Sequence, residues 1–370
     1  MKLLYVFPEE LTGRFAREYH VYRLAESLVA AGCDVTLAAA ASPRRTKQEQ
    51  LHDLFGGTRN ERLRVVWLKR QISIGPWEIR SGAWFFRQLD KLISALKPDG
   101  AFTMHVKAAD YLGKKHPSLP LVFEAHEIFA DTYPENSARH QRLLEMERRI
   151  YAHVRGVVAI SSYLAACLKN RFDLRAPIHV QHDGIDETML LDASVTPDPR
   201  ELIYAGSLQP WKGVPVAVAA MRLLPEFHLT VLGGSGKPLE LLRRDAPANV
   251  TFLGQAPRDA LHPFLQKASI GLMPNLLEPR SALYTFPLKL LEYSAAGKGI
   301  VASRIPLFDQ LNLGGWVELV PSGSSEALAA AVRSLAQRGM DRAAAQGWAR
   351  QFLWKNQGIA MKLFLEPLFK

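Results

Sequence analysis

A segment late in the chain combines an acidic residue with the start of a predicted helix. Thr285 could cap that helix, and Pro287 suits its first turn. The next backbone N–H groups, those of Leu288 and Lys289, would then lack partners and could bind an anion such as a diphosphate. Glu292, about one and a half turns into the helix, could accept hydrogen bonds from neighbouring sugar hydroxyls. The alternative is an ordinary amphipathic helix whose glutamate is solvated.

A glycine turn with a lysine at its end follows a predicted strand at 204–213. Gly206 lets the backbone approach a ligand, and Lys212 can place a point charge on a phosphate. A surface lysine that merely follows a turn is the alternative. The later run 233–236, Gly-Gly-Ser-Gly, matches neither the dinucleotide fingerprint nor the phosphate-loop consensus. We interpret that run as a permissive turn.

Two further positions in the first half of the chain could contact a ligand. His126 ends an apolar strand, where a histidine suits polar contacts and proton transfer near neutral pH, although a structural histidine fits equally well. Gly13 lies between the first strand and the first helix and would permit close approach of the backbone. The other ten histidines show no metal-ligand spacing, and no nucleophile elbow is present in the sequence. The sequence therefore predicts no metal site.

The elements that must position these residues alternate between short apolar runs and stretches of helical period. Predicted strands of the first half are 2–7, 34–40, 63–68, 101–106, 119–125, 157–161 and 179–182. After a proline-containing stretch at 192–200, six more follow at 202–205, 229–232, 250–253, 270–273, 300–303 and 317–320. Apolar strands alternating with helices indicate parallel sheets covered on both faces.

This alternation predicts an α/β protein with two doubly wound, Rossmann-like domains that face a central cleft. We place the domains at 1–192 and 201–345, with 346–370 as a terminal helix that packs back on the first domain. Ligands of such sheets bind beyond the carboxyl ends of the strands. Those ends are where Gly13, His126 and Gly206 are expected.

The composition excludes several classes of protein. With 370 residues, 48% apolar and 22% charged, the chain is typical of a globular protein and not of a disordered or fibrous one. Two cysteines argue against a disulfide framework. No uncharged apolar run approaches the roughly 18 residues of a membrane span, and no export signal is recognisable. We therefore expect a cytoplasmic protein.

The net charge of +10 is unevenly distributed. Residues 43–97 hold 12 Lys and Arg against 5 Asp and Glu, a surplus of 7, interleaved with Trp and Phe. This pattern favours peripheral attachment to an anionic membrane, on the inner face of the cell membrane. A core strand with a solvated basic face is the alternative. No nucleic-acid-binding motif accompanies the charge, so we expect no nucleic acid partner.

Taken together, these segments resemble the retaining nucleotide-sugar glycosyltransferases of family 4 (glycosyl transferases group 1), which have the GT-B fold. The resemblance is carried by the glycine turn at 205–213, the strand at 249–255 and the Pro-Leu-Lys-Leu-Leu-Glu-Tyr helix that starts at Pro287. Residues 157–161 and 181–186 look like the segments that close the family's first domain. The similarity spans nearly the whole chain.

The resemblance implies three catalytic residues and a donor site in the second domain. Glu292 would hold the ribose, Lys212 the diphosphate, and His126 would face the transferred sugar. The implied donor-binding residues are Gly13, Gly206, Ser207, Lys212, Gln255, Ala256, Tyr284, Thr285, Phe286, Leu288, Lys289 and Glu292. The family retains the donor's anomeric configuration, and needs no metal and no cofactor beyond the nucleotide-sugar co-substrate.

Two positions depart from the family's pattern. Tyr284 stands where many members have a second carboxylate, and Ser207 stands where many have arginine. One contact to the donor sugar and one to the phosphates are therefore missing or supplied differently. We interpret both changes as marks of a subgroup with altered donor selection.

The expected function is transfer of a sugar from a UDP- or GDP-sugar donor to a glycan or lipid-linked acceptor in polysaccharide biosynthesis at the cell envelope. A nucleotide-sugar epimerase or hydrolase of the same architecture is one alternative. A two-lobed sugar-binding protein without enzymatic activity is another, although the lack of an export signal counts against it.

Overall fold

The computed structural model describes the backbone of residues 1–12, 16–42, 46, 49, 63–74, 77–192, 194–255, 260–277, 284 and 286–370. The chain forms two compact units. One comprises Met1–Gly184 together with Trp354–Lys370, and the other comprises Ile185–Leu353. None of the described helices combines the length and apolarity that crossing a membrane requires.

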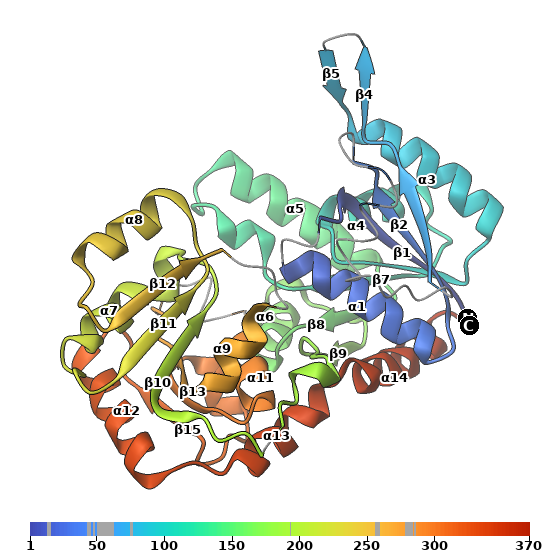
Figure 1. The fold of residues 1–370 in the computed structure, drawn as a ribbon. Helices are drawn as coiled ribbons and strands as arrows, with labels where there is room; N and C mark the ends of the chain where they lie inside the picture. Colours follow the sequence, from blue (N-terminus) through green and yellow to red (C-terminus); the bar gives the residue numbers. More distant parts are fainter. Residues whose placement is uncertain are drawn as a thin grey trace. The chain divides into compact units, whose positions relative to one another are not determined.

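The first unit is built on a seven-stranded parallel sheet (Figure 1). In spatial order the strands are β3 (Arg64–Leu68), β2 (Asp34–Ala40), β1 (Lys2–Glu10), β6 (Gly100–Thr103), β7 (Leu121–Ala125), β8 (Gly156–Ala159) and β9 (Ile178–Val180). The helices are α1 (Ala16–Ala30), α3 (Gly82–Leu96), α4 (Val106–Lys115), α5 (Ala138–His153) and α6 (Ser162–Phe172). The central strands are almost entirely buried, as strands with helices on both faces must be.

Two local features of this unit differ from the sequence prediction. The strand predicted at 101–106 ends at Thr103, because the Nδ1 atom of His105 accepts the N–H of Ala108 at 3.3 Å and caps α4. A separate antiparallel hairpin, β4 (Gln71–Ile74) with β5 (Trp77–Arg80), was not predicted. It lies within the basic segment 43–97, most of whose first twenty residues fall outside the described part of the chain.

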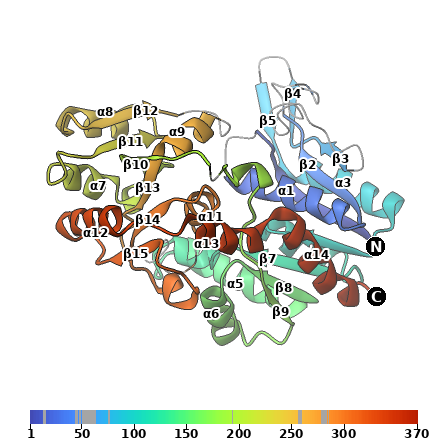
Figure 2. The ribbon, with the colours of Figure 1, turned by 60° about the horizontal axis from the view of Figure 1, so that its bottom comes forward.

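The terminal helix α14 (Trp354–Leu365) packs along α1 (Figure 2). Gly358 makes the close approach possible, since a Cβ atom there would lie 2.3 Å from the carbonyl oxygen of Ser27. The ammonium group of Lys362 donates to the carbonyl of Ala31 at 2.8 Å. Trp354 and Met361 join the apolar core formed by β1, β2 and α1.

The second unit has a six-stranded parallel sheet. In spatial order the strands are β12 (Val250–Gly254), β11 (His228–Leu232), β10 (Asp198–Ala205), β13 (Ala268–Met273), β14 (Gly299–Ser303) and β15 (Val317–Val320). The helices are α7 (Val214–Met221), α8 (Gly236–Asp245), α9 (Leu261–Lys267), α11 (Leu288–Ala295), α12 (Ser325–Arg338) and α13 (Arg342–Ala349). Both sheets have the strand order of a doubly wound fold. Successive strands are added on one side of the unit's first strand and then, after a crossover, on its other side.

The chain passes between the units at 184/185 and 353/354, whereas the boundaries predicted from the sequence are at 192 and 346. Side-chain contacts account for the difference. Gln346 of α13 donates to the carbonyl oxygens of Leu191 and Ala295, and Arg342 donates to that of Val195. These contacts attach both α13 and the segment after residue 185 to the second unit.

Candidate functional site

The helix start predicted to bind an anion lies in the second unit. Helix α11 begins at Leu288, and Pro287 is its N-cap residue and not part of the first turn as expected. Pro287 provides no side-chain cap, and Thr285 lies outside the described residues. Within the described part of the chain, the N–H groups of Leu288 and Lys289 have no acceptor. The helix start therefore has the unpaired donors that an anion requires.

Glu292 and Lys289 are buried on this helix, with 6% and 7% of their surfaces exposed. A solvated glutamate, the alternative considered from the sequence, is therefore wrong. Burial lowers the pKa of Lys289 to about 8, although the nearby carboxylate of Glu292 opposes the change. Charged side chains are rarely buried at this level without a partner.

The glycine turn after β10 packs closely against Lys289. The ammonium group of Lys289 lies 3.3 Å from the hydroxyl oxygen of Tyr204 and 4.3 Å from the centre of its ring. Gly206 has a φ of +150°, and a Cβ atom there would lie 3.0 Å from the Lys289 nitrogen. The Tyr204 hydroxyl in turn donates to the carbonyl of Ser207 at 2.7 Å. The positive φ of Gly206 favours glycine at this position, and any larger residue would also displace the Lys289 ammonium group.

Lys212 ends the short 3-10 helix η3 (Pro210–Lys212) that follows this turn. Its ammonium group lies 3.6 Å from the centre of the Trp211 ring. Burial and the neighbouring charge of Lys289 lower the pKa of Lys212 to about 6. Among the residues that the structure describes, no carboxylate forms an ion pair with Lys212 or Lys289. We call Lys212 and Lys289 the lysine pair; its chemistry suits an anionic ligand.

The remaining predicted donor residues are only partly described. Tyr284 and Phe286 are buried, and the Phe286 ring lies 5.8 Å from that of Phe352. Gln255 is exposed directly after β12. Gly13 and Ala256 fall outside the described residues.

His126 belongs to the first unit, where it follows the carboxyl end of β7 as predicted. Its side chain is 21% exposed, and its Nε2 atom lies 3.2 Å from the Oε1 atom of Glu124. That nitrogen has no well-aligned hydrogen bond. His126 is therefore held beside a buried carboxylate while part of its ring reaches the surface.

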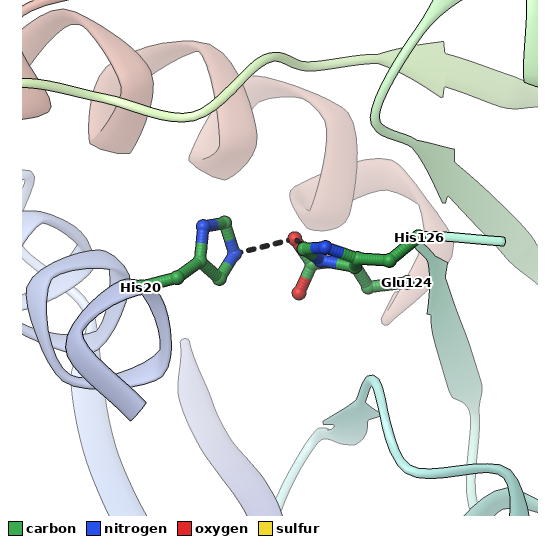
Figure 3. A group of neighbouring side chains, drawn as sticks. All are labelled: His20, Glu124 and His126. Atoms are coloured by element: carbon green, nitrogen blue, oxygen red, sulfur yellow. Dashed lines mark hydrogen bonds and ion pairs between the residues drawn. The ribbon is translucent and has the colours of Figure 1, made fainter. Parts of the chain in front are cut away.

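Three buried residues beside His126 were missed by the sequence analysis. His20 of α1 lies 2.6 Å from Glu124 Oε1 through Nε2 and 2.7 Å from Asp183 Oδ1 through Nδ1. We call His20, Glu124, His126 and Asp183 the histidine–carboxylate network; Figure 3 shows the first three. Two signals were available: Glu124 interrupts an apolar strand, and His20 lies on the apolar face of a helix.

His20, Glu124 and His126 come close enough to be considered as metal ligands, with candidate donor atoms within 4.8 Å of one another. The donor set argues against a metal. Both nitrogens of His20 lie at hydrogen-bond distance from carboxylate oxygens, so neither offers a free lone pair. Charge on His20 also holds the pKa of Glu124 well below its usual range, despite the opposing effect of burial. The geometry favours an ion-pair network.

Comparisons with known proteins agree on one family. The sequence model "Glycosyltransferase Family 4" matches residues 18–188, and "Glycosyl transferases group 1" matches residues 199–338. A glycogen synthase of Mycobacterium tuberculosis is 28% identical in an alignment of 411 positions that covers 97% of this chain and 93% of that protein. An amylovoran biosynthesis glycosyltransferase of Erwinia amylovora is 29% identical over 150 residues, 38% of this chain and 36% of that protein.

Solved structures share the fold at lower identity. The Anabaena protein HepE in complex with UDP superimposes with a TM-score of 0.71 at 18% identity, covering 99% of this chain and 100% of that one. At this level of identity the likeness shows the fold alone.

Proposed function

Since this chain belongs to the family 4 glycosyltransferases and has their two-domain GT-B fold, we propose that it transfers a sugar from a UDP- or GDP-sugar with retention of the anomeric configuration. In this reaction the bond between the anomeric carbon and the diphosphate oxygen breaks. A new bond forms between the anomeric carbon and an acceptor hydroxyl oxygen. The acceptor's proton moves to the leaving diphosphate, and the proposal includes no metal and no further cofactor.

The lysine pair is the observation that carries the proposal. Lys212 and Lys289 are both kept in surroundings that lower their pKa values, and no carboxylate among the described residues pairs with them. A nucleoside diphosphate would supply negative charge to both lysines, and the unpaired N–H groups at the start of α11 would add hydrogen bonds. We assign the ribose to Glu292 of the same helix. HepE was solved with UDP, which supports this class of donor.

His126 is the residue that we place against the transferred sugar. The relatives named above act in amylovoran biosynthesis and glycogen synthesis, which supports a glycan acceptor. We propose an acceptor of the cell envelope, either a glycan or a lipid-linked sugar.

A panel of UDP-, GDP- and TDP-sugars tests the donor class, because a bound ligand raises the unfolding temperature according to its affinity. We expect stabilisation by one nucleotide series. Glu292→Ala should then weaken binding of that nucleotide in calorimetry. Glu226→Ala is the matched control, because Glu226 is an exposed glutamate of the same unit that pairs with Arg333. Equal affinities for wild type and Glu292→Ala would contradict the assignment. Rapid release of nucleotide from donor alone would favour a hydrolase.

We also propose that the basic segment 43–97 attaches the enzyme to the inner face of the cell membrane. Its surplus of 7 positive charges supports this, together with Trp84 and Phe86 of α3, which are only partly buried. Vesicles of phosphatidylglycerol should sediment the protein at low salt, and vesicles of phosphatidylcholine should not. Failure to bind anionic vesicles would remove this part of the proposal.

A further inference from the structure

We infer that His20 is a positioning residue for the proposed transfer: as a buried imidazolium it holds Glu124 and Asp183 together and, through Glu124, fixes the ring of His126. The inference rests on the proposed function only for the role of His126 beside the sugar. The state of His20 itself is a separate matter and can be tested without any transfer reaction.

The number of hydrogen-bond donors that His20 must supply supports its charged form. A neutral imidazole has one N–H group, so one of its nitrogens would present a lone pair to a carboxylate oxygen. Here both nitrogens lie within 2.7 Å of carboxylate oxygens. An ionised carboxylate can only accept hydrogen bonds. Two donors on the ring are therefore required, and distances this short are typical of charge-assisted hydrogen bonds.

The surrounding charges agree with this geometry. His20 is 3% exposed, and burial by itself would lower its pKa, but Glu124 and Asp183 outweigh burial and raise the pKa to about 10. The other titratable groups at the network are His126 and Tyr5, whose hydroxyl lies 3.4 Å from Glu124 Oε2. His182, the neighbour of Asp183 in the chain, also interacts electrostatically with that carboxylate, and its Nδ1 atom donates a hydrogen bond to the carbonyl of Ile160 at 2.7 Å.

Glu124 connects His20 to His126. Its Oε1 atom lies 2.6 Å from His20 Nε2 and 3.2 Å from His126 Nε2, so a single oxygen faces both rings. The two imidazole rings meet edge to face, with centroids 5.0 Å apart and an angle of 86° between the planes. A displacement of Glu124 would therefore release His126 from its carboxylate contact.

The network is also packed against the ring of Trp354, which covers His20 and restricts its movement. The ring of Trp354, at the start of α14, lies 5.5 Å from that of His20 at 67°. Gly184 leaves the space for this ring, since a Cβ atom there would lie 2.5 Å from it. Elements α1, β7, α14 and the segment after β9 thus converge on His20. Groups that position a reacting residue need this kind of rigid support.

Nitrogen-15 NMR of the histidine side chains tests the charge state directly. At pH 8 we expect one histidine with both ring nitrogens protonated in wild type, and its loss in His20→Gln. His116→Gln is the matched control, because His116 also contacts a carboxylate, Asp90 at 2.7 Å, but is partly exposed and outside the network. Absence of a doubly protonated histidine from folded wild type would overturn the inference. Loss of those signals on addition of Zn²⁺ would do the same, because it would identify a metal site.

Transfer kinetics test the positioning role. His20→Gln should lower kcat by about 10- to 100-fold, with the KM for donor within about twofold of wild type. The pH–rate profile should also shift, because Glu124 would lose its ion pair with His20, which lowers the pKa of that carboxylate. Adding Asp183→Asn should restore part of kcat by removing one uncompensated negative charge. A loss of kcat with an unchanged profile and no restoration would indicate a purely structural residue. If wild type transfers no sugar, the proposed function fails while the NMR result still decides the state of His20.

Discussion

The two units place opposite kinds of charge near the carboxyl ends of their strands. In the first unit, the network surrounds the buried cation of His20 with two carboxylates at 2.6 and 2.7 Å. In the second unit, the lysine pair has tyrosine and tryptophan rings as neighbours and, within the described residues, no ion pair with a carboxylate. The first cluster contains both signs of charge at hydrogen-bond distance, whereas in the second the nearby carboxylate of Glu292 forms no ion pair with Lys289.

We infer from this difference that the charges of the histidine–carboxylate network hold side chains in place, whereas those of the lysine pair bind a ligand. A buried ion pair contributes rigidity once both partners are present, and removal of one partner leaves an uncompensated charge. Lys212 and Lys289 lie in surroundings that lower their pKa values, and placing a lysine in such poorly solvating surroundings costs folding free energy. Such a cost is typical of binding sites, where function is retained at the expense of stability. Variants of the two clusters should therefore affect stability in opposite directions.

The largest expected effect is on folding. His20→Ala should lower the free energy of unfolding by about 3–5 kcal/mol, because Glu124 and Asp183 would remain buried without a cation. Urea unfolding followed by circular dichroism measures this. His116→Ala is the control and should cost under about 1 kcal/mol, since the pair with Asp90 is partly exposed. Similar losses for the two variants would remove the contrast between them.

The next effect is on the reaction. His126→Ala should lower kcat by about 100-fold or more, because it removes the group that we propose to lie beside the transferred sugar. Affinity for UDP or GDP should change little, since the residues that we assign to the nucleotide belong to the other unit. Calorimetry and steady-state kinetics on the same preparations separate the two quantities. A parallel fall in nucleotide affinity would contradict this division of roles.

Removal of one lysine should affect binding but not folding. Lys212→Met should reduce nucleotide affinity by about 10- to 100-fold, from the loss of a charge-assisted hydrogen bond. The free energy of unfolding should stay equal or rise, because methionine does not incur the cost of placing an amine where its charged form is poorly solvated. Lys267→Met is the control, since Lys267 is exposed and paired with Glu201. Marked destabilisation by Lys212→Met would show that the lysine pair has a structural role.

The smallest effect is a pH dependence of nucleotide binding. The pKa of Lys212 is about 6 in the free protein, so this lysine is mostly neutral above pH 7. An anion favours the ammonium form, so binding should take up a proton and affinity should fall as pH rises from 7 to 9, by at most about tenfold per pH unit. Calorimetry in buffers of different ionisation enthalpy measures the uptake. Lys212→Met should abolish it, and an unchanged uptake in this variant would assign the proton elsewhere.

Most of the fold follows from local sequence patterns. The runs Asp34–Ala40 and Val317–Val320 have the same limits as predicted. Asp34–Ala40 is buried from its second residue onward, and such a strand is recognisable as a largely apolar run. Predictions failed where a side chain competes locally, as His105 does by starting α4. They also failed for the β4–β5 hairpin, although the sequence Gly75-Pro76 between the two strands is a turn signal. At the candidate site, the sequence indicated His126, Lys212 and Glu292 as ligand contacts. Each is a polar or charged residue that follows a predicted strand or turn or lies near the start of a predicted helix.

The sequence by itself determined the two doubly wound domains. It also determined the glycine turn at 204–213 and the helix start near Pro287, both of which suit an anion. Only the tertiary structure decided which charges meet. His20, Glu124 and Asp183 are separated by 104 and 163 positions along the chain, counted from His20. No periodicity encodes such a contact, since it depends on α1, β7 and the segment after β9 converging through packing. The same holds for the burial of Glu292, because an amphipathic pattern cannot distinguish a solvated carboxylate from a buried one.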